Sequence, residues 1–385
     1  MEKKKHFPAA AAVLIAGFAV CIIMYAAAAL NSSFADFYTD HIFIPLSMPF
    51  GFLTSLLPFS WGELLIILGI AVVIIGIPAD IFFLVRFRKD KAKQKKLAAF
   101  SLYFLGYILL YIMLTETLNC FIQYRCTGFS DKYWSDTPGS GYELSQLEEL
   151  CGSLTDRAVK LSEEVPRDSE GNVYLPDDAY EKAGLYMRML GEDYSRLSGW
   201  YTRPKEIVCS RFMSKSNLQG IYFPFTMEAN INKDMCPARK PDTMCHELAH
   251  TKGFIHEDEA GFIAYLACAN SGDPLFEYSG VLSAMTYSLN QYHKYADYDS
   301  FVNIVSRLTD RVRRDNRFLT DEYRQSLEKE KLLKAETVAA ASDKALNTNL
   351  KVNGIKDGTQ SYSRIVNLLL EEQERNKKRS AADSK

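Results

Sequence analysis

The sequence lacks an excess of charge of either sign. Its 385 residues include 45 Lys and Arg and 47 Asp and Glu, a formal net charge of −2. Proteins that bind nucleic acids concentrate basic residues because phosphate contacts dominate their affinity, so this composition argues against a nucleic-acid partner. The sequence also lacks an internal repeat, and none of its eight cysteines forms a CxxC motif. A zinc cluster built on cysteines is therefore not expected.

Long apolar stretches, by contrast, dominate the first third of the chain. Residues 7–30, 64–85 and 97–114 are almost uniformly apolar, and a transmembrane helix needs about 20 such residues. The first stretch is longer than the apolar core of a secretory signal, which has about 7 to 15 residues. We therefore expect it to remain as an anchor. The sequence predicts a membrane region over residues 1–119, with three transmembrane helices in contact with the lipid bilayer.

Basic residues predict the orientation of these helices. Three lysines, Lys3 to Lys5, precede the first stretch, and seven Lys and Arg lie within residues 86–96. Because basic loops stay on the cytoplasmic side of a membrane, we expect a multi-pass protein of the cell membrane with a cytoplasmic N-terminus. Residues 120–370 then form an extracytoplasmic domain, and the charged residues 371–385 are expected to be a disordered tail.

Two further patterns describe the intervening segment and the outer domain. Residues 41–61 are apolar but interrupted by prolines, which favours an interfacial or re-entrant segment with Trp61 at the headgroup level. In the outer domain, apolar residues recur at helical spacing over 143–164 and 178–197. Two short β-prone runs occur, at 207–209 and 220–225. The expected fold class is α+β, mostly helical.

The outer domain contains one motif with specific chemistry. His246, Glu247 and His250 form HExxH, and residues four apart on a helix share a face, so both imidazoles can reach one metal ion. Catalytic zinc takes three protein ligands and keeps a position for water, whose pKa falls to about 7. The sequence therefore predicts a Zn²⁺ site in which Glu247 is the general base. A helix that merely carries two surface histidines is the plain alternative.

The third ligand is predicted from the segment that follows. Gly253 is expected to end the motif helix, and a second helix is expected to begin near His256. On that helix Glu257 shares a face with small residues, which allow a close approach to the motif helix. Glu259 lies roughly 200° around the helix from Glu257 at about 100° per residue, so both cannot face one ion. We predict Glu257 as the third ligand, with His256, Glu259 or no third ligand as open alternatives.

The His256 alternative has a motif of its own. Residues 246–256 spell HExxHxxGxxH, which resembles the zinc motif of the metzincins. In that interpretation His256 is the third ligand, and Met285 corresponds to the Met-turn of that family. A solvent-facing histidine at a helix start is the plain interpretation of His256.

Three segments, residues 220–232, 245–268 and 276–287, resemble an uncharacterised family of bacterial membrane proteins, a domain of unknown function that groups with gluzincin-like HExxH metallopeptidases. The likeness covers most of the chain and implies a zincin-like outer domain with a metal site, but no known substrate. Gluzincins often place a polar residue four positions after the glutamate ligand, where this chain has Gly261. Such peptidases commonly add an extended peptide to an edge strand above the zinc helix, for which residues 220–225 are the candidate.

Several other side chains are candidates for supporting roles. Glu228 and Asn230 can orient a metal ligand or cap a turn. Tyr278 and Tyr287 can stabilise an oxyanion or lie in the core. Cys245 and Cys268 can approach each other across the helical hairpin, as a disulfide or as two buried thiols.

Together these patterns predict a membrane-anchored zinc metallopeptidase that hydrolyses a peptide or protein substrate. Zn²⁺ would be held by His246, His250 and Glu257, and Glu247 would activate water. The alternative is a catalytically inactive, metal-binding envelope sensor or scaffold. A third interpretation treats the HExxH motif as coincidence.

Overall fold

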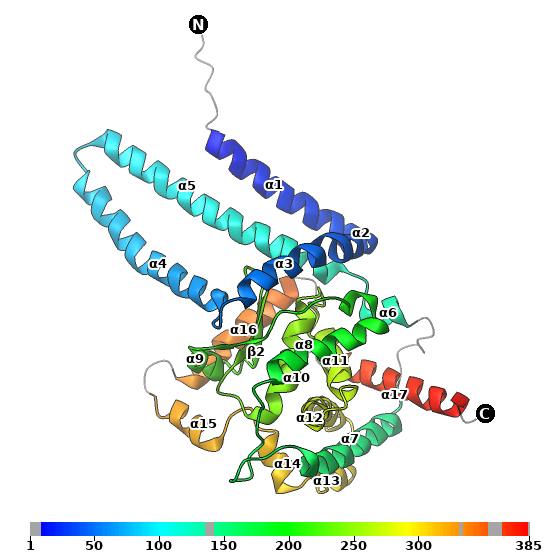
Figure 1. Ribbon diagram of the computed structural model, residues 1–385. Coiled ribbons are helices and arrows are strands. Elements are labelled where there is room, and N and C mark those ends of the chain that lie inside the picture. The colour runs from blue at the N-terminus through cyan, green and yellow to red at the C-terminus, as the bar shows by residue number, and fades with distance from the viewer. Residues whose placement is uncertain (1–8, 135–141, 331–333, 353–363, 384–385) are drawn as a thin grey trace.

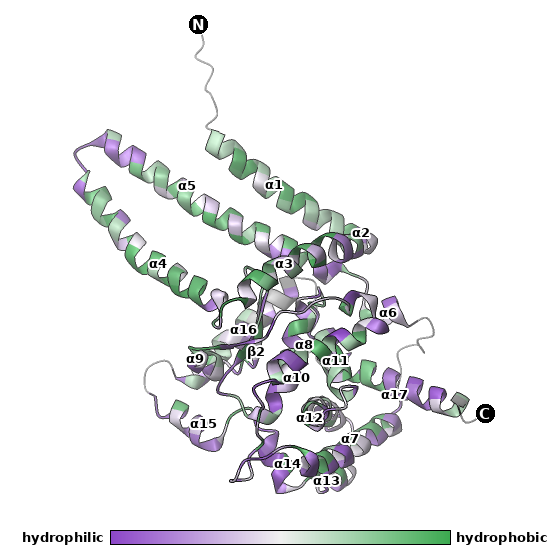
Figure 2. Cartoon of the chain, in the orientation of Figure 1, coloured by the Kyte–Doolittle hydropathy of each residue, from purple (hydrophilic) through white to green (hydrophobic). Residues whose placement is uncertain are grey.

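The computed structural model describes residues 9–134, 142–330, 334–352 and 364–383. Three apolar helices, α1 (Ala9–Leu30), α4 (Trp61–Arg86) and α5 (Lys91–Glu116), extend away from one end of a helical domain (Figures 1 and 2). Each is long and apolar enough to cross a membrane, and almost none of their side chains is buried within the protein. The chain is therefore a membrane protein, as predicted. The first two residues of the first predicted span, and Lys3 to Lys5, lie outside the described residues.

The segment between α1 and α4 is helical and lies against the domain. It comprises α2 (Ser32–Tyr38), a π-helical turn (Thr39–Phe43) and α3 (Ile44–Ser55). Helix α3 buries a narrow polar face (Ser47, Gly51 and Thr54) and exposes bulky apolar side chains (Leu46, Phe50, Phe52 and Leu53). The prolines do not prevent helix formation here: Pro45 occupies the first turn of α3, and Pro49 lies inside the helix.

The domain is built around five helices: α7 (Leu144–Glu164), α8 (Ala179–Met189), α10 (Lys240–His250), α11 (Glu257–Ala269) and α12 (Pro274–Tyr292). Helix α12 packs along α7, and α10 and α11 form a closely packed hairpin beside it (Figure 1). One continuous apolar core joins all five. Shorter or peripheral helices surround them: α6 (Phe129–Tyr133), α9 (Ser210–Lys215), α13 (Tyr298–Val305), α14 (Asp310–Asp315), α15 (Asp321–Glu328) and α16 (Ala335–Val352).

The last helix corrects one expectation. Residues 371–383, predicted to belong to a disordered tail, continue helix α17 (Arg364–Asp383). The first turns of α17 bury Ile365, Leu368 and Leu369 in the domain core. The charged turns that follow are held by contacts with other elements, such as the Lys377–Glu149 ion pair at 2.8 Å. A helix anchored at its apolar start propagates readily, because each added residue gains one hydrogen bond.

A three-stranded sheet covers one side of α10. Its order is β1-β3-β2, with β1 (Lys205–Ile207) parallel and β2 (Gly220–Phe223) antiparallel to the central β3 (Glu228–Asn232). The predicted run at 220–225 thus forms an edge strand, although it ends before Pro224. The fold is mostly helical with few strands, as expected.

Candidate metal centre

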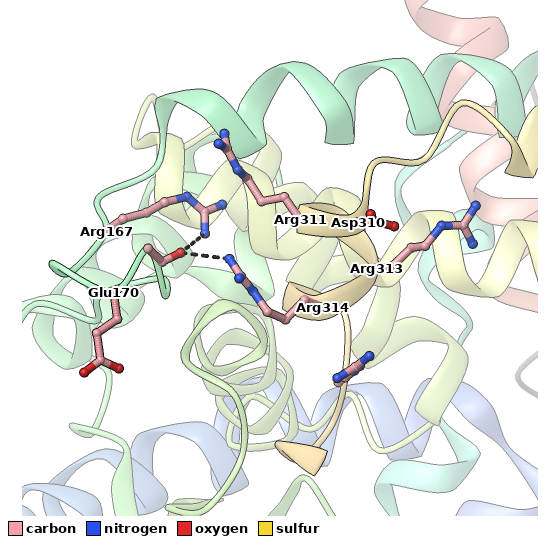
Figure 3. A pocket seen from close by; sticks show the side chains of 8 residues that line it. Arg167, Glu170, Asp310, Arg311, Arg313 and Arg314 are labelled. Atoms are coloured by element: carbon pink, nitrogen blue, oxygen red, sulfur yellow. Dashed lines mark hydrogen bonds between the residues drawn. The ribbon is translucent and has the colours of Figure 1, made fainter. Parts of the chain in front are cut away.

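Two clusters of polar side chains stand out among the described residues. The first is a cleft of about 540 Å³ lined mainly by arginines, with Arg167 and Glu170 on one side and α14 on the other (Figure 3). Its guanidinium groups are largely engaged: Arg167 and Arg314 each donate to the Gly171 carbonyl at 2.9 Å, and Arg167 also pairs with Asp315 at 2.7 Å. No histidine or cysteine lines this cleft. Its arginines fasten a loop to α14 and offer no nucleophile or soft metal ligand.

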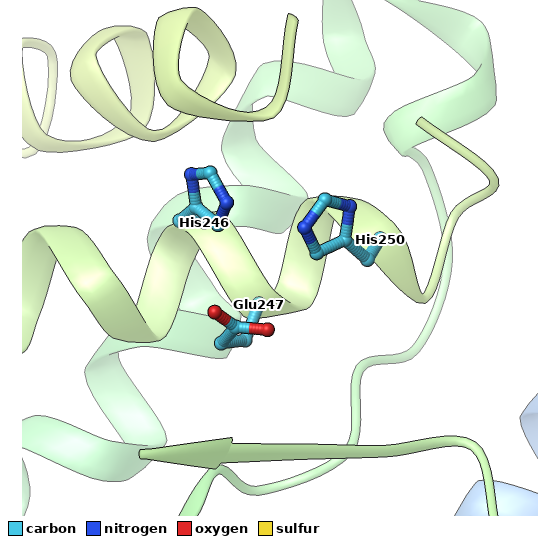
Figure 4. A group of neighbouring side chains, drawn as sticks. All are labelled: His246, Glu247 and His250. Atoms are coloured by element: carbon cyan, nitrogen blue, oxygen red, sulfur yellow. The ribbon is translucent and has the colours of Figure 1, made fainter. Parts of the chain in front are cut away.

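The second cluster is the HExxH motif. Helix α10 places His246, Glu247 and His250 on neighbouring turns (Figure 4), and their ligand atoms all lie within 4.8 Å of one another. The two imidazole rings have centroids 4.8 Å apart and planes 88° apart. This group has the residue types and the spacing that a metal ion requires.

Helix α11 brings one carboxylate to this pair. Glu257 Oε2 lies 3.1 Å from His246 Nε2, and both side chains are half-buried. The approach is close because the α11 face toward α10 includes Ala260 and Gly261, and small residues let two helix backbones pack tightly. On the other histidine, His250 Nδ1 lies 2.7 Å from the Phe254 carbonyl oxygen. That contact holds the ring and leaves Nε2 as its free ligand atom, as in many metal-binding histidines.

The alternative third ligands make other contacts. His256 Nε2 lies 3.2 Å from the Tyr124 carbonyl oxygen, with its ring edge-on to the Tyr124 ring. Glu259 Oε1 accepts the Phe129 N–H at 2.7 Å, at the start of α6. Met285 is buried in the middle of α12 rather than in a turn. Of the three candidates, only Glu257 makes a hydrogen-bonding contact with one of the two histidines among the described residues, at His246.

Strand β2 closes the site around Glu247. The Glu247 carboxylate accepts the backbone N–H of Tyr222, and its Oε2 is buried with no hydrogen-bond partner in the described part of the chain. A Cβ atom on Gly220 would overlap Oε1 and stand 2.7 Å from the Glu247 Cγ. Only glycine therefore allows β2 to lie this close to the motif helix.

Burial and neighbouring charges push the three pKa values apart. Burial lowers the pKa of His246, but the hydrogen bond and charge of Glu257 outweigh it and raise that pKa to about 9. Burial and the neighbouring His246 lower the pKa of His250 to about 4. Burial, together with the charge of Glu257, raises the pKa of Glu247 to about 8. At Glu247 burial thus outweighs the opposite charge of His246, and the site places a buried acid next to the neutral imidazole of His250.

The sequence analysis missed one acidic residue. Asp242 lies one turn before His246 on α10 and interacts with its charge. Asp242 Oδ2 accepts a hydrogen bond from Ser283 at 2.6 Å, while Oδ1 is buried without a partner among the described residues. At Gly261, where gluzincins carry a polar residue, a Cβ atom would stand 3.9 Å from His246 Nδ1 but only 2.9 Å from Ile365. The four-residue spacing from His246 was the signal that could have singled out Asp242.

The first two predicted supporting residues, Glu228 and Asn230, lie on strand β3. Glu228 lies away from the histidines and caps helix α4, accepting the N–H groups of Trp61 at 3.1 Å and Gly62 at 2.8 Å. Asn230 donates within the sheet, to the Ile221 carbonyl oxygen at 3.5 Å. Glu228 therefore acts as a structural group, whereas the Oδ1 of Asn230 is buried with no hydrogen-bond partner among the described residues.

The predicted tyrosines and cysteines have different surroundings. Tyr278 is fully buried and donates to Asp315 at 3.0 Å, so it belongs to the core. Tyr287 lies nearer the site: burial and the charges of Asp242 and Glu257 raise its pKa to about 12. Cys245 and Cys268 are two buried free thiols in hydrogen-bonding contact, and not a disulfide.

Comparison with known proteins identifies a family without assigning an activity. A search of curated proteins and a search of solved structures each found no match. Residues 38–370 match the family described as "Protein of unknown function (DUF3810)". The match extends from the segment after α1, through the HExxH helix, to the buried start of α17. Because it covers most of the chain, this protein belongs to the DUF3810 family.

Proposed function

We propose that this protein is a membrane-anchored zinc metallopeptidase with a zincin-like outer domain. The observation that supports the proposal most is the 3.1 Å contact of Glu257 with His246, next to His250 and a buried Glu247 carboxylate whose Oε2 has no hydrogen-bond partner among the described residues. Two imidazoles and one carboxylate are a ligand set of known catalytic zinc sites, which keep one position for water. HExxH alone is a short motif, and the approach of Glu257 is what distinguishes this site from a helix with two surface histidines.

Each residue of the site would have its own role in peptide hydrolysis. Zinc, when bound, would polarise a water molecule and the scissile carbonyl group. His246 Nε2, His250 Nε2 and Glu257 would hold the ion, while Phe254 keeps the His250 ring in place through Nδ1. Glu247 would take the proton of the water and pass it to the leaving amine.

The remaining parts of the proposal concern substrate and topology. Strand β2 is an edge strand that runs beside Glu247, and an extended peptide can add to such a strand through backbone groups other than the Tyr222 N–H, which donates to Glu247. Tyr287 is the tyrosine placed to stabilise an oxyanion. The basic loop between α4 and α5 lies at the opposite end of these helices from the domain (Figure 1). By the positive-inside rule, that loop is cytoplasmic and the domain extracytoplasmic.

The test combines metal analysis with a peptide-library digest of the full-length protein. We expect about one zinc ion per chain, peptide cleavage that a chelator abolishes, and a 10²- to 10⁴-fold loss of activity in Glu247→Gln with zinc retained. Full activity in a zinc-loaded Glu247→Gln protein would remove the role given to Glu247. Zinc binding without any cleavage would instead indicate a metal-binding envelope sensor or scaffold. Absence of zinc would favour a purely structural helix.

A further inference from the structure

The strand that lines the candidate site rests on the membrane helices. The Phe223 ring, at the end of β2, lies so close to Gly62 in the first turn of α4 that a Cβ atom there would stand 2.9 Å from its Cγ. The next residue, Pro224, accepts a hydrogen bond from Asn119 at 2.8 Å, just after α5. The Phe225 ring lies 5.6 Å from that of Tyr111 within α5. Strand β2 therefore begins at Glu247 and ends on the two helices.

The turn after the motif helix packs against the segment between α1 and α4. Gly253 has φ +81°, and a Cβ atom on it would stand 2.6 Å from Thr39 and 3.7 Å from Phe43, both in the segment between α1 and α4. Nearby, buried Arg196 bonds to Asp36 at 2.7 Å and to Asp40 at 2.6 Å. The α10–α11 hairpin thus sits against the inter-span segment, at the membrane end of the domain (Figure 1).

The length of α4 indicates how far the candidate site lies from the bilayer surface. Helix α4 has 26 residues, about 39 Å at roughly 1.5 Å per residue, whereas the hydrocarbon core of a bilayer is about 30 Å thick. Its first turn, with Trp61 and Gly62, therefore reaches the headgroup layer. From Phe223, which touches that turn, to Gly220, which touches Glu247, the strand is about 10 Å long at roughly 3.4 Å per residue. The proposed general base is a few residues of extended chain from the bilayer surface.

The apolar side chains of α3 extend this surface. Leu46, Phe50 and Leu53 are 65%, 44% and 59% exposed, while the opposite face of α3 packs on the domain. An apolar face in this position, between two membrane helices, is suited to the interface of the bilayer. It would hold the domain close to the membrane and keep the candidate site at one height above it.

We propose that the substrate is a membrane-anchored polypeptide, cleaved about three to five residues from the point where its anchor enters the bilayer. This inference rests on the proposed peptidase function. A peptide added to the outer edge of β2 passes Glu247 at the Gly220 end and reaches α4 and α5 at the Phe223 end. A chain whose next residues enter the membrane fits this path, and anchoring also raises its effective concentration at the site.

A labelling experiment tests the geometry without requiring activity. In full-length protein with Cys209→Ser, an environment-sensitive fluorophore is attached either at Ile221→Cys, on exposed β2, or at Arg313→Cys, on exposed α14. The protein is reconstituted into vesicles that contain lipids with a nitroxide on the headgroup. We expect at least threefold stronger quenching at 221 than at 313. Equal quenching at the two positions would overturn the inference.

A cleavage experiment tests the substrate class. One cleavable sequence, chosen from the library digest, is joined to a single transmembrane segment through a spacer of 4 or of 20 residues, and is also offered as a soluble peptide. In vesicles with the full-length protein, we expect the short-spacer substrate to be cleaved at least tenfold faster than the soluble peptide. Equal rates, or cleavage only with the long spacer, would overturn the inference. If zinc-loaded protein cleaves none of them, the peptidase function fails, whatever the labelling shows.

Discussion

Glu257 Oε2 lies 3.1 Å from Nε2 of His246, although eleven residues and a helix end separate them in the chain. The contact joins the second helix of the hairpin to the first histidine of the motif. It distinguishes Glu257 from its neighbours His256 and Glu259, which bond to Tyr124 and Phe129 instead. The ligand set of the proposed zinc site depends on this one relationship.

The first prediction concerns that ligand set. Glu257→Gln should weaken zinc binding about 100-fold or more. Loss of a residue that only hydrogen-bonds to a metal ligand typically weakens metal binding about 10- to 100-fold, and loss of a direct ligand weakens it further. His256→Gln, the matched control, should bind zinc normally, because it loses only the contact with the Tyr124 carbonyl. Competition with a chromophoric chelator measures both affinities. The reverse pattern would indicate the metzincin-like set instead.

The second prediction concerns pH. Zinc binds neutral imidazole, and the pKa of His246 is raised to about 9, so at lower pH the metal must displace a proton. Zinc affinity should therefore rise with pH up to about 9, with release at pH 7 of about one proton from His246 and up to one more from Glu247, whose pKa is about 8. Calorimetry in buffers of different ionisation enthalpy counts these protons. An affinity that does not change between pH 6 and 9 would contradict the pairing of His246 with Glu257.

The third prediction concerns the close approach of β2 to the motif helix. In Gly220→Ala the new methyl group must displace the Glu247 side chain or the strand. A shift of about 1 Å in a catalytic group can cost about 100-fold in rate, so we expect a 10- to 100-fold lower kcat with zinc retained. Val208→Ala, at an exposed position just after β1, should leave kcat within about threefold. Steady-state kinetics with matched zinc content decides, and unchanged kcat in Gly220→Ala would argue against Glu247 as the base.

The fourth prediction assigns a positioning role to Asp242. Its buried, unpaired Oδ1 lies one turn from His246, where a carboxylate can steady the ring and favour the metal-binding form. Asp242→Asn should weaken zinc binding about 10- to 100-fold while the thermal midpoint of the zinc-free protein changes little. Ser283→Ala, which removes the hydrogen bond to the other oxygen, is the control and should have the smaller effect on affinity. Equal losses in both variants would mean that Asp242 only supports the fold.

The fifth prediction concerns the join between sheet and membrane helix. Lys205 Nζ lies 2.6 Å from Glu228 Oε1, both side chains are almost fully buried, and Glu228 also caps α4. Removing one partner of a buried pair typically costs about 3 to 5 kcal/mol, because the other charge is left unpaired. Lys205→Met should therefore lower the thermal midpoint in detergent markedly. The double variant Lys205→Met/Glu228→Gln should recover part of that loss, and failure to do so would show that the pair is not coupled.

The sequence by itself determined the properties that depend on neighbouring residues. The membrane helices follow from uninterrupted apolar runs, and the shared face of His246 and His250 follows from helical periodicity within one element. The same local argument placed Glu257 and Glu259 on different sides of one helix. It could not decide which of them, or His256, meets the histidines, because that depends on how α11 crosses α10.

Only the tertiary structure decided the contacts between elements distant in sequence. It assigned Glu228 to the cap of α4, Tyr278 to Asp315 and Ile365 to the space beside Gly261, and it made the charged residues 371–383 helical. It also joined β2 to the membrane helices. The physical reason is that a spacing along one helix or strand reports only the residues of that element, whereas these contacts arise from packing between elements whose register no local pattern encodes.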